Sequence, residues 1–272
     1  MVKQLSVVRK LTIETYPPYD LSCLPEMPNL KHLRMHGIVR KLPRLAKPLD
    51  LEWLEIYSCD PWYDAIPEYA TRKLLVYNVT DRLIANLHRN SRLEYLTLYQ
   101  GKLTSCRPLA LCENLRTLRL TDCKKVTELS GLTGLRCIDI DSNQLQFDGT
   151  AVCEMPFLDV LSFYLRRASV ELCPLEEAPS LKMLVLDAKS VTPSTWTKVD
   201  CVQTYCPECS ITSVVKQRWV ITLEKSLIDF AAVTLARCFT GDGFRRHGLV
   251  ANISTLGRGE LYQIAVSPPK KR

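Results

Sequence analysis

The chain lacks the hydrophobic segments that carry a protein into or through a membrane. Arg9 and Lys10 interrupt the N-terminus before the apolar core of a secretory signal could form. No stretch approaches the roughly 18 uncharged apolar residues of a membrane span. We therefore expect an intracellular protein, cytoplasmic or nuclear, that is not secreted and has no membrane contact. Its 12 cysteines are then expected in a reducing compartment, mostly as small buried hydrophobic residues.

Short enzyme motifs are also missing. The sequence contains no HExxH pair, no Walker loop, no dinucleotide glycine pattern and no Ser/His/Asp arrangement. Its four histidines are scattered, and His32 and His36 lie two positions on either side of Arg34 without a nearby carboxylate to complete a site. We therefore expect no catalytic residue, no cofactor and no enzymatic activity.

The charge excess is mild. The formal net charge is +7, from 36 Lys+Arg against 29 Asp+Glu. Such an excess favours an acidic partner but falls short of the concentrated basic patch of a dedicated nucleic-acid binder. Residues 267–272 form a basic tail after two prolines, which is similar to a short nuclear-import signal or simply keeps the terminus solvated.

One spacing of apolar residues recurs along most of the chain. Leu115–Cys123 has apolar residues at positions 1, 4 and 6 and a cysteine at position 9. The segment from Leu135 repeats this spacing, with Asn143 at position 9. The central apolar residue recurs at steps of 20 to 23 residues, at Leu11, Leu33, Leu54, about Leu75, Leu96, Leu118, Ile138, Leu161 and Leu184.

This LxxLxLxxN/CxL pattern resembles the leucine-rich-repeat superfamily, in its cytosolic type with Asn or Cys at the strand exit, over roughly residues 5–200. The resemblance implies an α/β solenoid with a curved parallel sheet on its concave side and irregular or short helical connections on its convex side. It also implies that the concave sheet recognises proteins. Amphipathic helices would give the same leucine spacing, but about nine units in one register disfavour them.

The repeated pattern makes three predictions about local structure. Alternation puts the residues at positions 4 and 6 in the core and the residues between them on the outer face. A Cys or Asn at position 9 can hydrogen-bond a neighbouring coil. Prolines keep the connections short, with some helix expected near Asp81–Asn90.

The register ends near residue 200, so we expect a solenoid over residues 1–205. Residues 206–266 are expected to form an α+β cap over the last coil, with a small functional module as the alternative. Within them, Trp219–Leu223, Gly248–Ser254 and Glu260–Val266 are predicted strands, and Leu223–Phe239 a predicted amphipathic helix.

The outward positions 3, 5 and 7 of the units make the candidate binding surface. Large aromatics cluster in its first half, and Trp, Tyr and Arg are the residues that dominate binding hot spots. Ordinary surface variation is the alternative, and a register error of one residue would exchange the two faces. The candidate partner-binding residues are His32, Arg34, His36, Trp53, Glu55, Tyr57, Tyr95, Tyr99, Arg119, Asp139, Asp141 and Tyr164.

Cys206 and Cys209 form a Cys-x-x-Cys pair, which is half of a zinc motif. A structural zinc site needs four ligands, and no second pair lies nearby. A redox role needs a thioredoxin-like context that is absent. We expect a plain structural role and no metal.

The combined prediction is a scaffold or adaptor that binds a protein partner on the concave face. The alternative is a nuclear, nucleic-acid-associated protein that uses the +7 charge and the basic tail.

Overall fold

The computed structural model describes part of the chain, which forms two compact units, Met1–Gly134 and Leu135–Arg272. The described residues are 5–14, 21–36, 42–45, 47–57, 65, 69–126, 129–141, 146–148, 150–171, 180–181, 183–192, 201–204, 213–215, 219–224, 250–256 and 261–267. Among these residues, side chains are described up to residue 164, apart from residues 146–148 and 150, and at residues 180–181.

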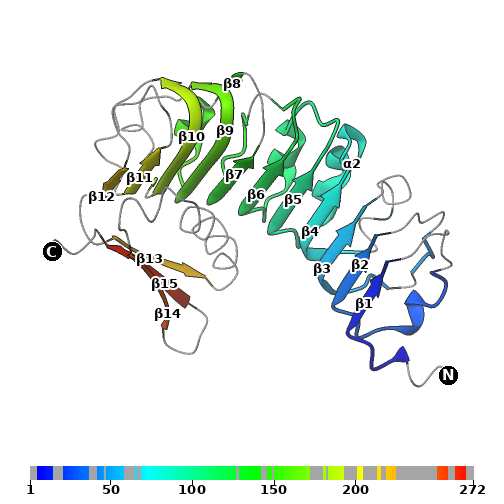
Figure 1. Ribbon diagram of the computed structural model, residues 1–272. Coiled ribbons are helices and arrows are strands. Elements are labelled where there is room, and N and C mark those ends of the chain that lie inside the picture. The colour runs from blue at the N-terminus through cyan, green and yellow to red at the C-terminus, as the bar shows by residue number, and fades with distance from the viewer. Residues whose placement is uncertain are drawn as a thin grey trace. The chain divides into compact units, whose positions relative to one another are not determined.

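The first unit contains a parallel sheet in which each strand pairs with the strand of the next coil (Figure 1). Every coil enters the sheet in the same direction and returns along one side, which gives an α/β solenoid-like fold. The strands are β1 (Lys10–Ile13), β2 (His32–Met35), β3 (Leu51–Ile56), β4 (Thr71–Tyr77), β5 (Tyr95–Tyr99) and β6 (Thr117–Thr121).

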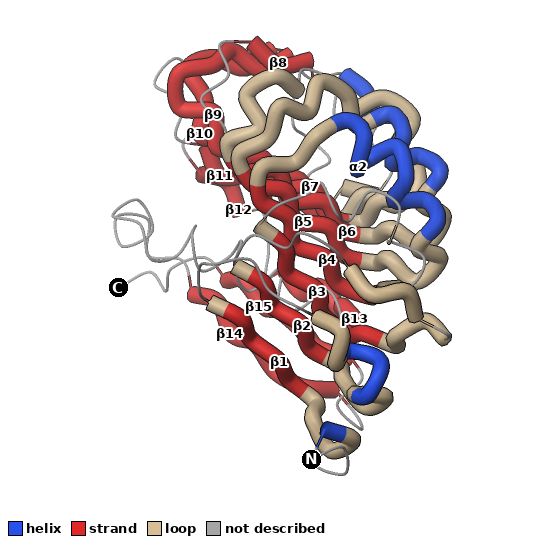
Figure 2. Tube along the Cα trace, turned by 90° about the vertical axis from the view of Figure 1, so that its right-hand side faces the viewer, coloured by secondary structure: helices blue, strands red, loops and turns tan. Residues whose placement is uncertain are grey.

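The connections between these strands are short. They contain η1 (Leu24–Glu26), α2 (Asp81–Asn86), η3 (Leu87–Arg89) and η4 (Arg107–Leu111). Figure 2 shows α2 to one side of strands β4–β6. The helix expected near Asp81–Asn90 is confirmed by α2 and η3, and a proline in the first turn of η1 and of η4 fits the brevity of both.

The core of the first unit is a stack of leucines contributed by successive coils. Leu33, Leu54, Leu96 and Leu118 are completely buried, and residues two positions later, such as Ile56 and Leu98, are buried beside them. Since one coil cannot shield its own apolar side chains, burial comes from the coils before and after it. The predicted alternation of buried and outward positions is confirmed.

The fourth unit of the predicted repeat was placed one residue too late. Leu54 pairs with Leu74, which is 2% exposed, while Leu75 pairs with Glu55 and faces outward. Leu74, Leu75 and Val76 are consecutive apolar residues, so alternation alone does not select the buried ones. The corrected register puts Lys73 and Tyr77 on the outer face.

Polar side chains link successive coils by hydrogen bonds to backbone carbonyls. The Asn29 Nδ2 group donates to the Ser6 carbonyl at 2.7 Å, and Asn114 Nδ2 donates to the Ser91 carbonyl at 2.7 Å, each 23 residues back. The buried Cys123 thiol donates to the Leu98 carbonyl one coil earlier, at 3.6 Å. The expected position-9 cysteine contact is therefore confirmed.

The second unit contains parallel strands of very different lengths. β7 (Cys137–Asp141), β9 (Val160–Glu171), β10 (Met183–Thr192) and β11 (Cys201–Thr204) pair in that order, and β8 (Gln146–Asp148) pairs with β9. β12 (Ser213–Val215) joins β11 in antiparallel orientation. A short helix, η5, covers Thr150–Glu154. The boundary expected after residue 205 falls between β11 and β12 and stays a prediction.

The C-terminal segment contains a separate antiparallel sheet in the order β13–β15–β14. Its strands are β13 (Trp219–Glu224), β14 (Val250–Leu256) and β15 (Leu261–Ser267), which confirms the three predicted strands to within about two residues. The helix predicted over Leu223–Phe239 lies almost entirely outside the described residues, and so do Cys206 and Cys209.

Most cysteines of the described side chains are free thiols, as expected. Cys106, Cys112, Cys123 and Cys137 are buried and Cys23 is half-buried. Cys153 departs from this expectation because it is disulfide-bonded. In the described part of the chain, no helix has the length and apolar character needed to cross a membrane.

Candidate functional site

The outward side chains of β1–β6, together with His36 and Tyr57 directly after β2 and β3, form a surface that we call the open face, which lies opposite the leucine core. The strand register arranges it in three rows that run across the strands. The first row is Lys10, His32, Trp53, Lys73, Tyr95 and Thr117; the second is Thr12, Arg34, Glu55, Leu75, Thr97 and Arg119; the third is His36, Tyr57, Tyr77, Tyr99 and Thr121.

Four rings of the third row form a continuous stack, which we call the aromatic ladder. Its members are His36, Tyr57, Tyr77 and Tyr99. The ring centroids of Tyr57 and Tyr77 are 3.8 Å apart with planes inclined by 15°, and those of Tyr77 and Tyr99 are 4.8 Å apart at 12°. His36 closes the ladder 4.0 Å from Tyr57. Parallel strands about 4.8 Å apart bring equivalent rings to stacking distance, so the ladder follows from the repeat itself.

Tyr77, in the middle of the ladder, is a neutral phenol. Burial raises the pKa of Tyr77 well above its ordinary value, and hydrogen bonding with Tyr57 raises it further. The Tyr77 hydroxyl therefore remains protonated and can act as a hydrogen-bond donor and acceptor. All four rings are only half-buried, so their outer edges are open to a ligand.

Glu55 is a buried carboxylate on the open face that contacts two nitrogen-bearing side chains. Its carboxylate is 6% exposed and lies 3.1 Å from Arg34 Nε and 3.3 Å from His36 Nε2. Burial by itself would lower the pKa of Arg34, but the charge of Glu55 and the hydrogen bond with Tyr57 raise it overall. Arg34 therefore stays charged and is held in one orientation.

The histidine prediction needs correction. No carboxylate was expected near His32 and His36, because none is close to them in the sequence. The strand register brings Glu55 beside His36, and Glu52 lies 3.7 Å from His32 Nε2. Both carboxylates come from the next coil, about 20 residues later in the chain.

The candidate residues differ widely in exposure. Trp53 is 37% exposed, as expected of a contact residue. Tyr95 is only 8% exposed and Arg119 only 9%, so their expected exposure was wrong. Lys73, which the sequence analysis missed, lies over the Tyr95 ring at 4.9 Å from its centroid and helps to cover it.

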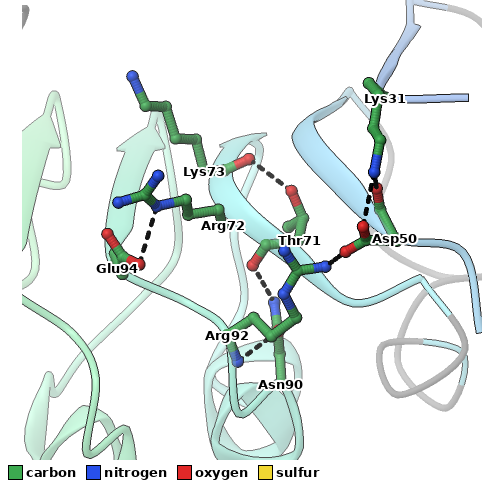
Figure 3. Close-up of polar contacts among 8 residues, drawn as sticks. All are labelled: Lys31, Asp50, Thr71, Arg72, Lys73, Asn90, Arg92 and Glu94. Atoms are coloured by element: carbon green, nitrogen blue, oxygen red, sulfur yellow. Dashed lines mark hydrogen bonds and ion pairs between the residues drawn. The ribbon is translucent and has the colours of Figure 1, made fainter. Parts of the chain in front are cut away.

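A row of charged residues stands where the strands begin, and its members are already paired (Figure 3). Asp50 forms ion pairs with Lys31 at 2.6 Å and with Arg92. Arg72 pairs with Glu94 at 2.8 Å. The Lys73 side chain points away from these pairs. Since their charges are neutralised locally, we assign this row to coil-to-coil cohesion.

The remaining candidates belong to the second unit. Asp139 is completely buried and pairs in the register with Ser162, whereas Asp141 and Tyr164 are half-buried and lie opposite each other on β7 and β9. These acidic residues were expected to extend the surface of the first coils. The burial of Asp139 removes it from any exposed surface.

A hollow of about 330 Å³ opens on the first three strands of the open face. The residues that line it are Lys10, Leu11, Thr12, His32, Leu33, Arg34, Trp53 and Glu55. Within the residues whose side chains are described, no group of three or more His, Cys, Asp or Glu residues could hold a metal ion. The chemistry available here is recognition by ring edges, hydroxyls and cations.

The buried thiols give a direct test of the core. Burial raises the pKa of Cys112 and of Cys123 to about 11. At pH 8 only about one such thiol in a thousand is ionised, so both should resist iodoacetamide in the native protein. Site-resolved mass spectrometry should find them alkylated only after denaturation, with the half-buried Cys23 as reference. Equal labelling of Cys123 and Cys23 in the native state would contradict the buried assignment.

No protein-family model matches the chain, and no curated protein is similar to it in sequence. The resemblance to leucine-rich repeats therefore depends on the repeat pattern and on the parallel coils alone.

Proposed function

We propose that the chain is a leucine-rich-repeat protein that acts as a scaffold or adaptor and binds a protein partner on the open face, the concave face in that superfamily. The observation that carries this proposal is the aromatic ladder. Three tyrosines and a histidine from four successive coils stand in one row with their edges half exposed. A solenoid core needs none of them.

The ladder is suited to binding because its rings are already ordered. Each ring is fixed by its neighbours at 3.8 to 4.8 Å, so a partner has little side-chain entropy to remove. Aromatic side chains supply large contact areas and dominate interface hot spots, where truncation commonly costs 2 kcal/mol or more by general experience. Trp53 adds an exposed indole two rows away.

A protein partner fits the open face better than a nucleic acid does. A base that intercalated between two rings would need roughly twice the 3.8 Å that separates Tyr57 from Tyr77. Two cations that could contact phosphates, Lys31 and Arg72, are already paired with carboxylates. The nuclear, nucleic-acid-associated alternative therefore has less support.

We also propose that residues 206–266 cap the repeat array. β12 pairs with β11 in antiparallel orientation and so ends the run of parallel strands. A repeat array needs a different structure over its last coil, because that coil has no following coil to cover its core.

The proposal predicts that Trp53→Ala combined with Tyr99→Ala weakens partner binding by about 30-fold, because two hot-spot side chains are lost. Proteins retained on immobilised wild-type chain would be identified by mass spectrometry, and the affinity of the purified partner then measured for each variant. The matched control is Leu111→Ala with Phe157→Ala, which removes two side chains that are 63% and 61% exposed outside the open face.

The control variant should bind like the wild type. If the control loses binding and the Trp53/Tyr99 variant retains it, the partner uses another surface and the open-face proposal fails.

A further inference from the structure

The hollow on β1–β3 combines two cations with an exposed indole. The register pairs Thr12 with Arg34, and Lys10 with His32. From strand spacing and rise, the Cα atoms of Lys10 and Arg34 lie roughly 8 Å apart. Both side chains line the hollow, and both are long enough to reach one anion between them.

Lys10 differs from Arg34 because it has no ion-pair partner among the described residues. Its side chain is exposed. Arg34 is held from below by the buried Glu55 carboxylate, 3.1 Å from Nε, while its side chain remains 43% exposed. The Arg34 guanidinium is thus held by Glu55, whereas the Lys10 side chain can change its conformation to meet a ligand.

Trp53 forms the wall toward β3. It lies opposite His32 in the register and is 37% exposed. An indole offers an apolar surface for a hydrocarbon chain and one N–H donor. The volume of about 330 Å³ corresponds to roughly ten water molecules, which is room for one glutamate side chain with its backbone.

We propose that this hollow is the anchor subsite for an acidic peptide segment, with one Asp or Glu carboxylate held between Lys10 and Arg34 and its hydrocarbon chain packed on Trp53. The inference rests on the proposed protein-binding function and specifies its partner chemistry. Charge complementarity carries it, because Lys10 and Arg34 outweigh Glu55 in the lining, and Glu55 is already engaged by Arg34 and His36.

General attraction must be separated from this site, since a net charge of +7 draws any polyanion. The probe is fluorescein-labelled hexaglutamate with blocked termini, measured by fluorescence anisotropy at about 150 mM salt, where the Debye length is about 8 Å. Hexaglutamine is the uncharged control peptide. We expect hexaglutamate to bind with a dissociation constant of about 1 mM or tighter, and hexaglutamine not to bind.

The decisive comparison is Lys10→Glu against Lys124→Glu, which makes the same charge change at an exposed lysine outside the hollow. Lys10→Glu should weaken hexaglutamate binding at least tenfold and Trp53→Ala about fivefold, while Lys124→Glu changes it less than twofold. Equal losses of hexaglutamate affinity in the two lysine variants, or no binding of hexaglutamate to the wild type, would contradict the proposed subsite. Hexathymidylate that binds more tightly than hexaglutamate and depends on Lys10 would overturn it in favour of nucleic acid.

Failure of this inference is distinguishable from failure of the proposed function. The peptide assay uses neither the partner nor Tyr99. A partner that still depends on Trp53 and Tyr99 while hexaglutamate does not bind would leave the open face as the binding surface and remove only its acidic specificity.

Discussion

Gly101→Ala is expected to lower the free energy of unfolding by about 3 kcal/mol, the upper end of the usual range for overpacking. A Cβ atom at this position would lie 2.1 Å from Val79 Cγ1 and 2.8 Å from the Val79 carbonyl oxygen. Neither atom is free to move, because Val79 is completely buried and its carbonyl accepts a hydrogen bond from the Lys102 N–H at 2.9 Å. The two coils would have to separate.

Gly134→Ala is the matched control. Its added Cβ meets a flexible arginine end, Arg116 Nη1, at 3.4 Å and a carbonyl at 3.6 Å, which are ordinary contacts. We expect a change within about 0.5 kcal/mol in urea unfolding. A Gly101 variant as stable as the Gly134 variant would mean that the coils do not approach each other at Val79.

The repeat could be predicted from the sequence because burial in a stack of coils is a local pattern. Each coil buries two apolar residues at alternate positions, so Leu33, Leu54, Leu96 and Leu118 fix the strand register by themselves. The exception is Leu74, which is followed directly by the apolar residues Leu75 and Val76. The pattern of alternating buried residues can therefore start at Leu74 or at Leu75. Packing against the neighbouring coils decides which of the two residues is buried, and the local sequence does not contain this information.

The candidate site could be predicted only in outline, because its chemistry depends on contacts between coils. Outward alternation identified Tyr57 and Tyr99, but the phase error at Leu74 hid Tyr77, the ring that joins them into one ladder. Reading Tyr77 in the same phase as its neighbours would have found it. The strand lengths of the second unit, 12 residues in β9 against 5 in β7, have no counterpart in the repeat pattern.

Side-chain burial on the open face was the least predictable property. A carboxylate at an outward position is ordinarily exposed, yet Glu55 is buried because Arg34 and His36 of the preceding coil close over it. Tyr95 is likewise covered by Lys73 from the preceding strand. Such contacts arise between residues 19 to 22 positions apart, so the sequence indicates which face a residue occupies but not how crowded that face becomes.

Glu55→Ala is expected to lower the free energy of unfolding by about 3 kcal/mol, because it removes the buried carboxylate from two nitrogen partners at once. Breaking a fully buried ion pair costs about 3–5 kcal/mol, and the 43% exposure of Arg34 puts this site at the lower end, since water can solvate the released guanidinium. The matched control is Glu52→Ala on the same strand. Its carboxylate is 59% exposed and lies 3.7 Å from His32, so its loss should cost less than about 1 kcal/mol.

Urea unfolding of both variants measures the difference, and a double-mutant cycle with Arg34→Met isolates the pair. Once Glu55 is replaced, Arg34→Met should cost little, because the guanidinium has lost the partner that oriented it. If Glu55→Ala is no more destabilising than Glu52→Ala, the carboxylate is solvated in solution and the fixed orientation of Arg34 is lost as a premise of the anchor subsite. A large difference with strong coupling would instead establish that the open face is preorganised before any partner arrives.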